Sequence, residues 1–356
     1  MDKEKVLGTI KSATRSFADR LNNQYAENLD DEFYQGFDLC MMKMMNLLKY
    51  MQILSFVLPL AFLSCSNDTI EDVHFIPQTK IGQKLLAGSE TVARIYTDTS
   101  FVVALGVTET DVHFQKADSR STHIFIIDID LNEPGVSLEV GMPYDADVRN
   151  NFQRQTLTEM ADYADRPWHR VAAMINADFW DVSTMDIRGP IHRNGVILKN
   201  SFIFKESLPQ QALSFIALTK DNKMVIADSV EYRGMQYNLK EVTGSGVIVL
   251  RDGEISGATY PGIDPRTCLG YSDDGHVYFM VVDGRVEFYS YGLTYPEMGS
   301  IMKALGCSWA VNLDGGGSTQ MLIRHPIADI FQIRNRPSDG QERPVVNAWM
   351  VTVNEP

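Results

Sequence analysis

The segment from residue 312 to residue 319 places one carboxylate, three glycines and two hydroxyl groups directly after an apolar run. Three consecutive glycines cost backbone entropy on folding, so they are expected where the chain needs positive φ or must approach another group closely. Their N–H groups could surround phosphate or sugar oxygens, while Asp314 would supply a charge and Ser318 and Thr319 would supply hydrogen-bond donors. A tight turn between two core strands is the structural alternative. The segment is the first candidate for a ligand-binding loop.

A second polar group, Asn176-Ala177-Asp178-Phe179-Trp180-Asp181, follows the apolar run 171–175. Asn176 can both donate and accept hydrogen bonds, and the two acids can serve as general acid, general base or metal ligand. An Asx turn around an aromatic plug is the structural alternative for either acid alone. The position of these groups at the end of a predicted strand makes them candidates for catalysis.

Two arginines, Arg266 and Arg343, each stand beside a proline at the entrance to an apolar strand. An unpaired charge would be costly there, so we expect an anionic partner for Arg266. A guanidinium can donate two parallel hydrogen bonds to a phosphate. Together with the glycine triplet, the two arginines would form a phosphate pocket.

The segment 186–195 adds two weaker candidates, Arg188 and His192. Arg188 could bind phosphate in the same way, whereas a solvated arginine and a surface histidine are the structural alternatives. The Asn194-Gly195 pair at the end of the segment is a strong signal for a hairpin turn, so part of the segment is architectural.

The elements that must position these groups are mostly strands. The runs 123–130 and 136–140 flank an Asn132-Glu133-Pro134-Gly135 turn and predict a hairpin. Further strands are expected at 171–175, 214–218, 224–226, 247–250 and 277–282. The Asp273-Asp274-Gly275 turn predicts a connection between two hairpin strands.

Two helices are expected among these strands. Residues 155–163 predict a short helix with Thr156 or Thr158 as its cap. Thr294-Tyr295-Pro296-Glu297 has the pattern of a capping box and predicts a helix that ends at Gly306. Glu297 therefore has a structural role in this interpretation. The pattern indicates an α+β fold, with a single mixed domain of β-sheets and a few helices packed on them, from about residue 80 to residue 356.

The overall charge excludes one broad class of partner. The chain has a formal net charge of -14, whereas proteins that bind nucleic acid usually carry a basic stripe to neutralise phosphates. We expect no nucleic-acid partner, and any anionic ligand must be held by a few local arginines. Composition leaves the oligomeric state open.

The N-terminal region resembles the signal peptide and lipidation site of a bacterial lipoprotein. Residues 41–52 form a short basic region, and 53–63 form an apolar stretch that is short for a membrane span. Ser64-Cys65 follows at once, which predicts a lipoprotein signal peptide over 41–65 with lipidation at Cys65, an upstream extension over 1–40 and a tether over 66–80. A buried helix that ends in cysteine is the alternative. The expected location is the bacterial cell envelope, where the protein would be membrane-anchored through the lipid and periplasmic or surface-exposed.

The two remaining cysteines, Cys268 and Cys307, stand in apolar contexts without a CxxC pattern. We expect two buried free thiols. A disulfide between them is the alternative in an oxidising compartment.

Taken together, the polar segments resemble ordered blocks of the phosphodiester glycosidase family. Residues 174–181 resemble the family's I-N-G-G-F-F-D block, 265–270 its P-R-T-A-I-G block and 282–285 its D-G-R block. Residues 312–318 match its N-L-D-G-G-G-S outright, and 343–345 resemble its closing R-P-V. The resemblance covers about residues 120 to 355. The chain departs from it at Ala177-Asp178, where the family has two glycines, so the substrate cannot simply be carried over.

The resemblance implies a hydrolase that cleaves a sugar from a glycosyl-1-phosphodiester on glycans or glycoconjugates. With the residues identified above, the candidate catalytic residues are Asp314, Asp178, Asp181 and Asn176, and the candidate substrate- or phosphate-binding residues are Arg266, Arg343, Arg188, His192, Gly315, Gly316, Gly317, Ser318 and Thr319. The acids could instead hold Ca²⁺ or Mg²⁺ through oxygen ligands, so a requirement for a cation stays open. A cell-surface lipoprotein that binds glycans without cleaving them is the alternative function.

Overall fold

The computed structural model describes residues 75–258, 260 and 262–355. The predicted upstream extension, the signal peptide with Cys65 and the tether up to residue 74 lie outside the described residues. Within the described part, no helix is long and apolar enough to cross a membrane.

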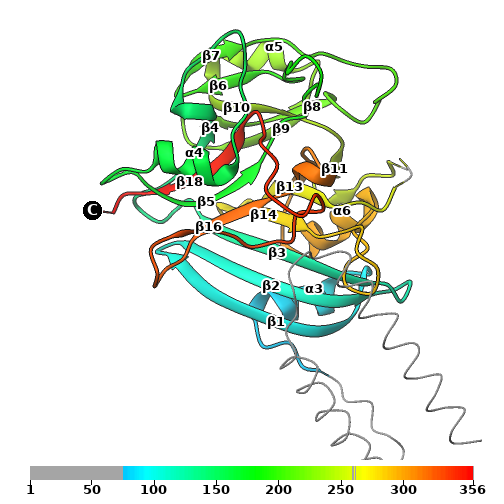
Figure 1. The fold of residues 1–356 in the computed structure, drawn as a ribbon. Helices are drawn as coiled ribbons and strands as arrows, with labels where there is room; N and C mark the ends of the chain where they lie inside the picture. The colour runs from blue at the N-terminus through cyan, green and yellow to red at the C-terminus, as the bar shows by residue number, and fades with distance from the viewer. Residues whose placement is uncertain (1–74, 259, 261, 356) are drawn as a thin grey trace, which may run out of the picture. The chain divides into compact units, whose positions relative to one another are not determined.

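The described chain forms three antiparallel sheets (Figure 1). The largest contains, in spatial order, β1 (Val92–Ala104), β2 (Val107–Lys116), β3 (Ser121–Asp130), β14 (His276–Val282), β13 (Arg266–Tyr271), β15 (Trp309–Asn312), β11 (Ile248–Arg251) and β12 (Glu254–Ile255). One five-stranded sheet contains β7 (Val196–Lys199), β6 (Ile191–Arg193), β10 (Leu239–Ser245), β8 (Ser214–Thr219) and β9 (Met224–Asp228). The other contains β17 (Phe331–Ile333), β16 (Met321–Arg324), β5 (Arg170–Asn176), β18 (Ala348–Val353) and β4 (Val136–Gly141).

The helices cover the outer faces of these sheets. α3 (Lys80–Gly88) and α6 (Tyr295–Leu305) pack on one face of the eight-stranded sheet, α4 (Leu157–Ala164) packs against β5 and β16, and α5 (Tyr232–Met235) packs on the sheet of β8 and β10. The short 3-10 helices are η2 (Pro143–Asp145), η3 (Gln236–Asn238) and η4 (Gly316–Ser318).

One hydrophobic core joins all three sheets. It contains Phe279 from the eight-stranded sheet, Ile175 and Trp349 from the sheet of β5 and β18, and Ile216 from the sheet of β8. The indole N–H of Trp349 donates a hydrogen bond of 2.8 Å to Oγ1 of Thr243 on β10, so the contact between the two smaller sheets has a polar link as well. The chain segments that follow β5 and β15 meet at this core, where the N–H group of Asp314 donates a hydrogen bond of 2.9 Å to the carbonyl oxygen of Ala177.

The α+β class and several local predictions are confirmed. Thr294 and Glu297 form the capping box of α6, and Gly306 ends the helix in the left-handed conformation with φ 100°. Thr156 caps α4, also with a capping box. Asn194-Gly195 joins β6 to β7 as expected. Cys268 and Cys307 are both free and buried.

The predicted hairpin of residues 123–130 and 136–140 is wrong. β3 pairs with β2 on one side and β14 on the other, whereas β4 pairs with β18 in a different sheet. Ile124, Ile126, Ile127 and Ile129 are all buried, as in a strand that is covered on both faces. Since β3 already has two neighbours, the turn after it carries the chain into another sheet.

Candidate active site

The glycine triplet lies where the chain passes from the eight-stranded sheet to a five-stranded sheet, between the end of β15 and the start of β16. Gly316 has φ 61°, a conformation that glycine adopts without strain. A Cβ atom on Gly317 would lie 1.9 Å from Nη2 of Arg343, and one on Gly315 would lie 2.9 Å from the carbonyl oxygen of Pro265. Gly315 is therefore favoured by the close backbone of Pro265 and Gly316 by its positive φ, and the missing side chain at Gly317 leaves the space that the Arg343 guanidinium occupies.

Two of the three glycine N–H groups have partners within the protein. Gly316 donates a hydrogen bond of 2.9 Å to the carbonyl oxygen of Pro265, and Gly315 donates to the carboxylate of Asp314. These two groups are not free to surround a ligand. The loop contributes mainly by holding Asp314 and by leaving space for arginine side chains.

Asp314 is half-buried at the start of this loop. Burial raises the pKa of Asp314 to about 6, although hydrogen bonds from the side chains of Ser318 and Trp180 and the charge of Arg343 favour its ionised form. A carboxylate with these partners is held in one orientation and stays ionised in neutral solution.

Asn176 holds the backbone of Asp314 in place from the protein interior. Its side-chain amide donates a hydrogen bond of 2.7 Å to the carbonyl oxygen of Asp314, and its Oδ1 accepts from Oγ1 of Thr267 at 2.7 Å and from the N–H group of Gln320 at 3.1 Å. The residue is 1% exposed. Asn176, a candidate catalytic residue, thus ties β5, β13 and the glycine loop together.

Asp178 is the second carboxylate near Asp314 and is 2% exposed. Its Oδ2 accepts hydrogen bonds from the N–H groups of Gly189 at 3.2 Å and Gly244 at 3.0 Å, whereas its buried Oδ1 has no partner within the described residues. A Cβ atom on Gly189 would lie 2.2 Å from Cα of Gly244. Both glycines are needed for the two N–H groups to converge on one oxygen.

The protonation of Asp178 is set by burial and by two opposite charges. Burial raises the pKa of Asp178 to about 7, whereas the charge of Lys199 and the hydrogen bonds from Gly244 and Gly189 oppose this rise, and the nearby charge of Asp314 adds a smaller increase. Burial also lowers the pKa of Lys199, whose Nζ donates a hydrogen bond of 3.0 Å to the carbonyl oxygen of Gly189. The site therefore contains two interacting carboxyl groups, one of which holds a proton close to neutral pH.

Asp181 has a different environment, although it follows the same strand. One oxygen accepts from the N–H group of Ser183 at 3.0 Å and from its hydroxyl, and the other pairs with Lys205 and with Arg188 at 3.4 Å. These hydrogen bonds lower the pKa of Asp181 well below its usual range. The structure places Asp178, and not Asp181, in electrostatic contact with Asp314.

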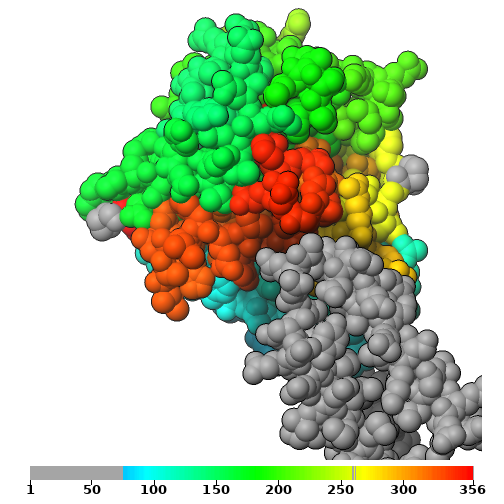
Figure 2. Space-filling view, in the orientation of Figure 1, coloured from blue at the N-terminus to red at the C-terminus, as the bar shows by residue number. Residues whose placement is uncertain are grey.

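Two arginines lie over the glycine loop. Arg343 pairs with Asp339 at 2.6 Å and donates a hydrogen bond of 3.4 Å to Oγ of Ser318. The guanidinium of Arg285 would lie 3.1 Å from a Cβ atom on Gly316 and pairs with Asp264 at 3.1 Å. Both guanidinium groups are partly exposed, so they can reach an anionic group of a ligand. Figure 2 shows the segment before β18 (red) at the surface.

Arg266 is buried and has its partners within the protein. Its guanidinium donates hydrogen bonds to the carbonyl oxygens of Leu293 at 3.1 Å and Gly262 at 2.8 Å, and its Cζ lies 4.5 Å from the ring centre of Tyr295. The expected anionic partner is Asp264, at 3.9 Å. The structure thus places the Arg266 guanidinium against α6 and the loop before β13.

Arg188 and His192 are buried in other surroundings. Arg188 pairs with Asp181, and His192 forms a hydrogen bond of 2.7 Å with the hydroxyl of Tyr232. Burial lowers the pKa of His192 to about 4, so it is neutral at physiological pH. Thr319, in contrast, lies in the loop itself, and its buried Oγ1 has no partner in the described part of the chain.

Five residues that contribute to the site were not among the predicted ones: Arg285, Lys199, Asn347, Gly189 and Gly244. Asn347 accepts a hydrogen bond of 2.9 Å from the N–H group of Asp178 and is fully buried. Arg285 stands in one of the sequence blocks, which was the only signal available for it. The others act through contacts between segments far apart in sequence.

The sequence left a Ca²⁺ or Mg²⁺ site open. Among residues 75–258, 260 and 262–355, no three His, Cys, Asp or Glu side chains are grouped in a way that could hold a metal ion. Asp178 and Asp314 bring two carboxylates to the site, and the chemistry open to these side chains is the transfer of a proton and the stabilisation of positive charge.

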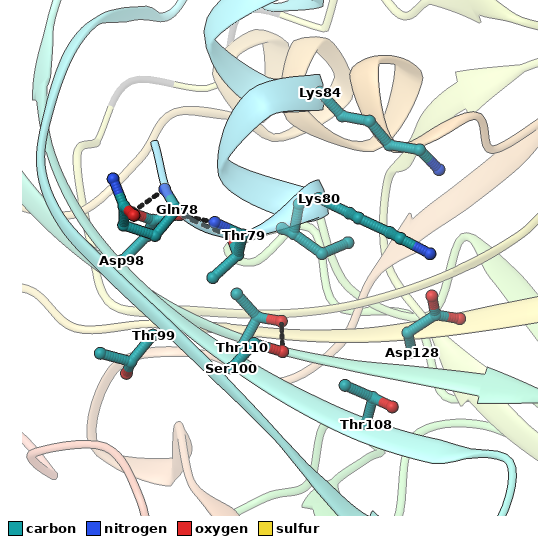
Figure 3. Close-up of a pocket in the computed structure, with 11 residues that line it drawn as sticks. Gln78, Thr79, Lys80, Lys84, Asp98, Thr99, Ser100, Thr108, Thr110 and Asp128 are labelled. Carbon is teal, nitrogen blue, oxygen red and sulfur yellow. Dashed lines mark hydrogen bonds between the residues drawn. The ribbon is translucent and has the colours of Figure 1, made fainter. Parts of the chain in front are cut away.

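A cavity of about 730 Å³ lies elsewhere, between α3 and strands β1 to β3 (Figure 3). Lys80, Thr108 and Asp128 point into it, and Thr108 lies on the face of β2 opposite to Val107, which belongs to the core between the sheets. The cavity is therefore separate from Asp314 and its neighbours.

The raised pKa of Asp178 predicts how stability depends on pH. Because the native-state pKa of about 7 exceeds the ordinary value of 3.8, the native state binds more protons than the unfolded state between about pH 4 and pH 7. Stability from this group is therefore lost as the pH rises through that range. We expect Asp178→Asn to raise the free energy of unfolding relative to wild type above pH 7, with a gain that shrinks towards pH 4, in urea unfolding at several pH values.

Asp181→Asn is the matched control, because the pKa of Asp181 is lowered and its effect has the opposite sign. This variant should lose stability at neutral pH and approach wild type as the pH falls. A difference between wild type and Asp178→Asn that does not change with pH would contradict the assignment.

Comparison with known proteins agrees with the sequence blocks. The sequence model of the phosphodiester glycosidases (NAGPA) matches residues 169–352, which run from β5 to the penultimate residue of β18 and include every site residue described above. The SPβ prophage-derived uncharacterized protein YomE of Bacillus subtilis (strain 168) is 37% identical over 88 residues, which are 25% of this chain and 13% of that protein. The chain thus matches only a small part of this relative's length.

Two solved structures have a similar fold. The catalytic domain of zebrafish N-acetylglucosamine-1-phosphodiester alpha-N-acetylglucosaminidase, auto-inhibited by its pro-peptide, is 17% identical, with a TM-score of 0.52 over 73% of this chain and 83% of that one. A hypothetical protein from Synechocystis is 14% identical, with a TM-score of 0.51 over 70% of this chain and 62% of that one. At these identities the likeness concerns the fold. With the family match over more than half of its length, the chain belongs to the phosphodiester glycosidase family.

Proposed function

We propose that the protein is a hydrolase that cleaves a sugar from a glycosyl-1-phosphodiester on glycans or glycoconjugates. The observation that carries this proposal is the combination of the half-buried Asp314 with two partly exposed arginines over the same glycine loop. An acidic protein with a net charge of -14 has little general attraction for phosphates, so these local arginines must supply it. The name of the zebrafish enzyme describes the same class of substrate bond.

The arginines act on the leaving group. As the bond between the anomeric carbon and the phosphate oxygen breaks, negative charge grows on the phosphate and positive charge grows on the sugar ring. Arg343 and Arg285 stabilise the departing phosphate, because their guanidinium groups are already fixed by Asp339 and Asp264. A phosphate is a good leaving group, so the reaction needs less proton donation than cleavage of an ordinary glycoside.

The two carboxyl groups have separate roles. Asp314 is the accessible one and stabilises the developing charge at the anomeric carbon, whereas Asp178 is almost fully buried behind it and responds to its charge. The oxygen of a water molecule bonds to the anomeric carbon, and the proton that this water loses passes to a carboxylate and then to solvent. The products are the free sugar and a phosphate monoester.

Asp314→Asn tests this proposal directly. The change keeps the shape of the side chain and removes its charge, so we expect the rate of sugar release from a glycosyl-1-phosphodiester to fall by about a hundredfold or more. Release of free sugar from a panel of sugar 1-phosphodiesters, measured with the soluble chain from residue 66 onward, checks the result.

Asp329→Asn is the control for this change, because Asp329 has a side chain 65% exposed and pairs with Arg170 and Arg324 on the surface. It should keep wild-type activity. Binding of the sugar phosphodiesters without release of sugar by the wild-type protein would instead support the glycan-binding alternative.

We also propose that the protein is a lipoprotein of the cell envelope, anchored through Cys65. The support is the order of a basic region, an apolar stretch and Ser64-Cys65 in the sequence. We expect the native protein, analysed by intact mass spectrometry, to begin at Cys65 with added lipid, and the Cys65→Ser variant to be found without it. An unlipidated native chain that retains residues 1–64 would contradict this proposal.

A further inference from the structure

A further arginine, Arg154, contacts Trp180, which in turn contacts the Asp314 carboxylate. Its Cζ is 4.9 Å from the centre of the Trp180 ring, a distance at which a guanidinium is attracted to the face of an indole. Trp180 is 7% exposed, and its side chain is a hydrogen-bond partner of Asp314. The indole therefore has the catalytic carboxylate at one side and a cation on its face.

The guanidinium of Arg154 differs from the neighbouring ones in its partners. Arg343 pairs with Asp339, Arg285 with Asp264 and Arg188 with Asp181. Within the part of the chain that the structure describes, Arg154 has no such carboxylate partner, and it is half-buried. Stacking on an aromatic ring fixes the plane of a guanidinium but leaves its N–H groups able to donate. Because Arg154 is half-buried and its N–H groups are not engaged by a carboxylate, they can donate to an anionic ligand.

The segment that carries Arg154 is attached to the segment that carries Arg343. The N–H group of Gln155 donates to the carbonyl oxygen of Val345 at 3.1 Å, and the N–H group of Val345 donates to the carbonyl oxygen of Gln155 at 2.8 Å. Oγ1 of Thr158 donates to the Glu342 carboxylate at 2.6 Å. In Figure 2 the green region that includes this segment borders the red segment before β18. The segments that carry Arg154 and Arg343 are thus held side by side.

We infer that Arg154 binds an anionic group on the part of the substrate that leaves with the phosphate, so that the preferred substrate carries at least one negative charge beyond the scissile phosphodiester. This inference rests on the proposed function. A phosphodiester has a single negative charge, and Arg343 and Arg285 already lie over the loop where it would bind. Arg154 lies outside residues 169–352, the range that the family model matches.

The test uses two product analogues: methyl phosphate, and 1,3-propanediol bisphosphate, which carries a second phosphate on a three-carbon chain. Wild type should bind the bisphosphate more tightly in calorimetric titrations at low salt, and Arg154→Gln should weaken its binding by about tenfold while methyl phosphate is bound as before. High salt should reduce the preference of the wild type, because the contact is partly exposed. Arg149→Gln, which removes an exposed arginine five residues earlier, should behave as wild type.

Measuring the hydrolysis of sugar 1-phosphodiesters separates the anion-binding role of Arg154 from the proposed hydrolase function. If Arg154→Gln weakens the binding of both phosphates equally, or if wild type does not distinguish them, the inference is overturned even when sugar 1-phosphodiesters are hydrolysed. If the charge preference depends on Arg154 but no sugar 1-phosphodiester is cleaved, the anion-binding role stands and the proposed hydrolase function fails. A melting temperature of Arg154→Gln equal to that of wild type shows that the binding change does not come from unfolding.

Discussion

Two carboxyl groups lie close together inside the layer where the three sheets meet, and much of the local architecture exists to hold them there. Burying a carboxylate without partners would cost several kcal/mol, so its hydrogen-bond donors must converge from different parts of the chain. For Asp178 these donors are two backbone N–H groups brought together by the contact of Gly189 with Gly244. For Asp314 they come from its own loop and from Trp180. A change in how the sheets pack would therefore move these acids relative to their hydrogen-bond donors.

The glycine loop connects this buried pair to the surface. Because the glycines have no side chains, Arg285 and Arg343 lie directly against the loop backbone. Two positive charges are therefore placed next to the glycine loop in a protein whose net charge is negative. Asn176 fixes the loop from the protein side through bonds to Asp314, Thr267 and Gln320. Asp314 and the two guanidinium groups thus lie at the same loop, as the proposed separation of a sugar cation from a phosphate anion requires.

The sequence identified the loop, the capping box of α6 and the fold class, because each depends on residues close together in the chain. It could not separate Asp178 from Asp181, which stand three residues apart after the same strand. Their difference comes from Gly244, 66 residues away, and from Lys205, 24 residues away. The same reason explains the error at β3 and β4, since the turn between them is local but the choice of neighbouring strand is not. Arg154 gave no sequence signal, because its role depends on the position of Trp180.

The interaction between Asp178 and Asp314 is tested most directly by the titration of individual aspartates by NMR, with ¹³C label at the side-chain carboxyl carbons. We expect one carboxyl with a midpoint near pH 7, absent from the spectrum of Asp178→Asn and shifted to lower pH in Asp314→Asn, where the neighbouring negative charge is gone. Titration of every aspartate in or below the ordinary range near pH 4 would contradict a buried, interacting pair.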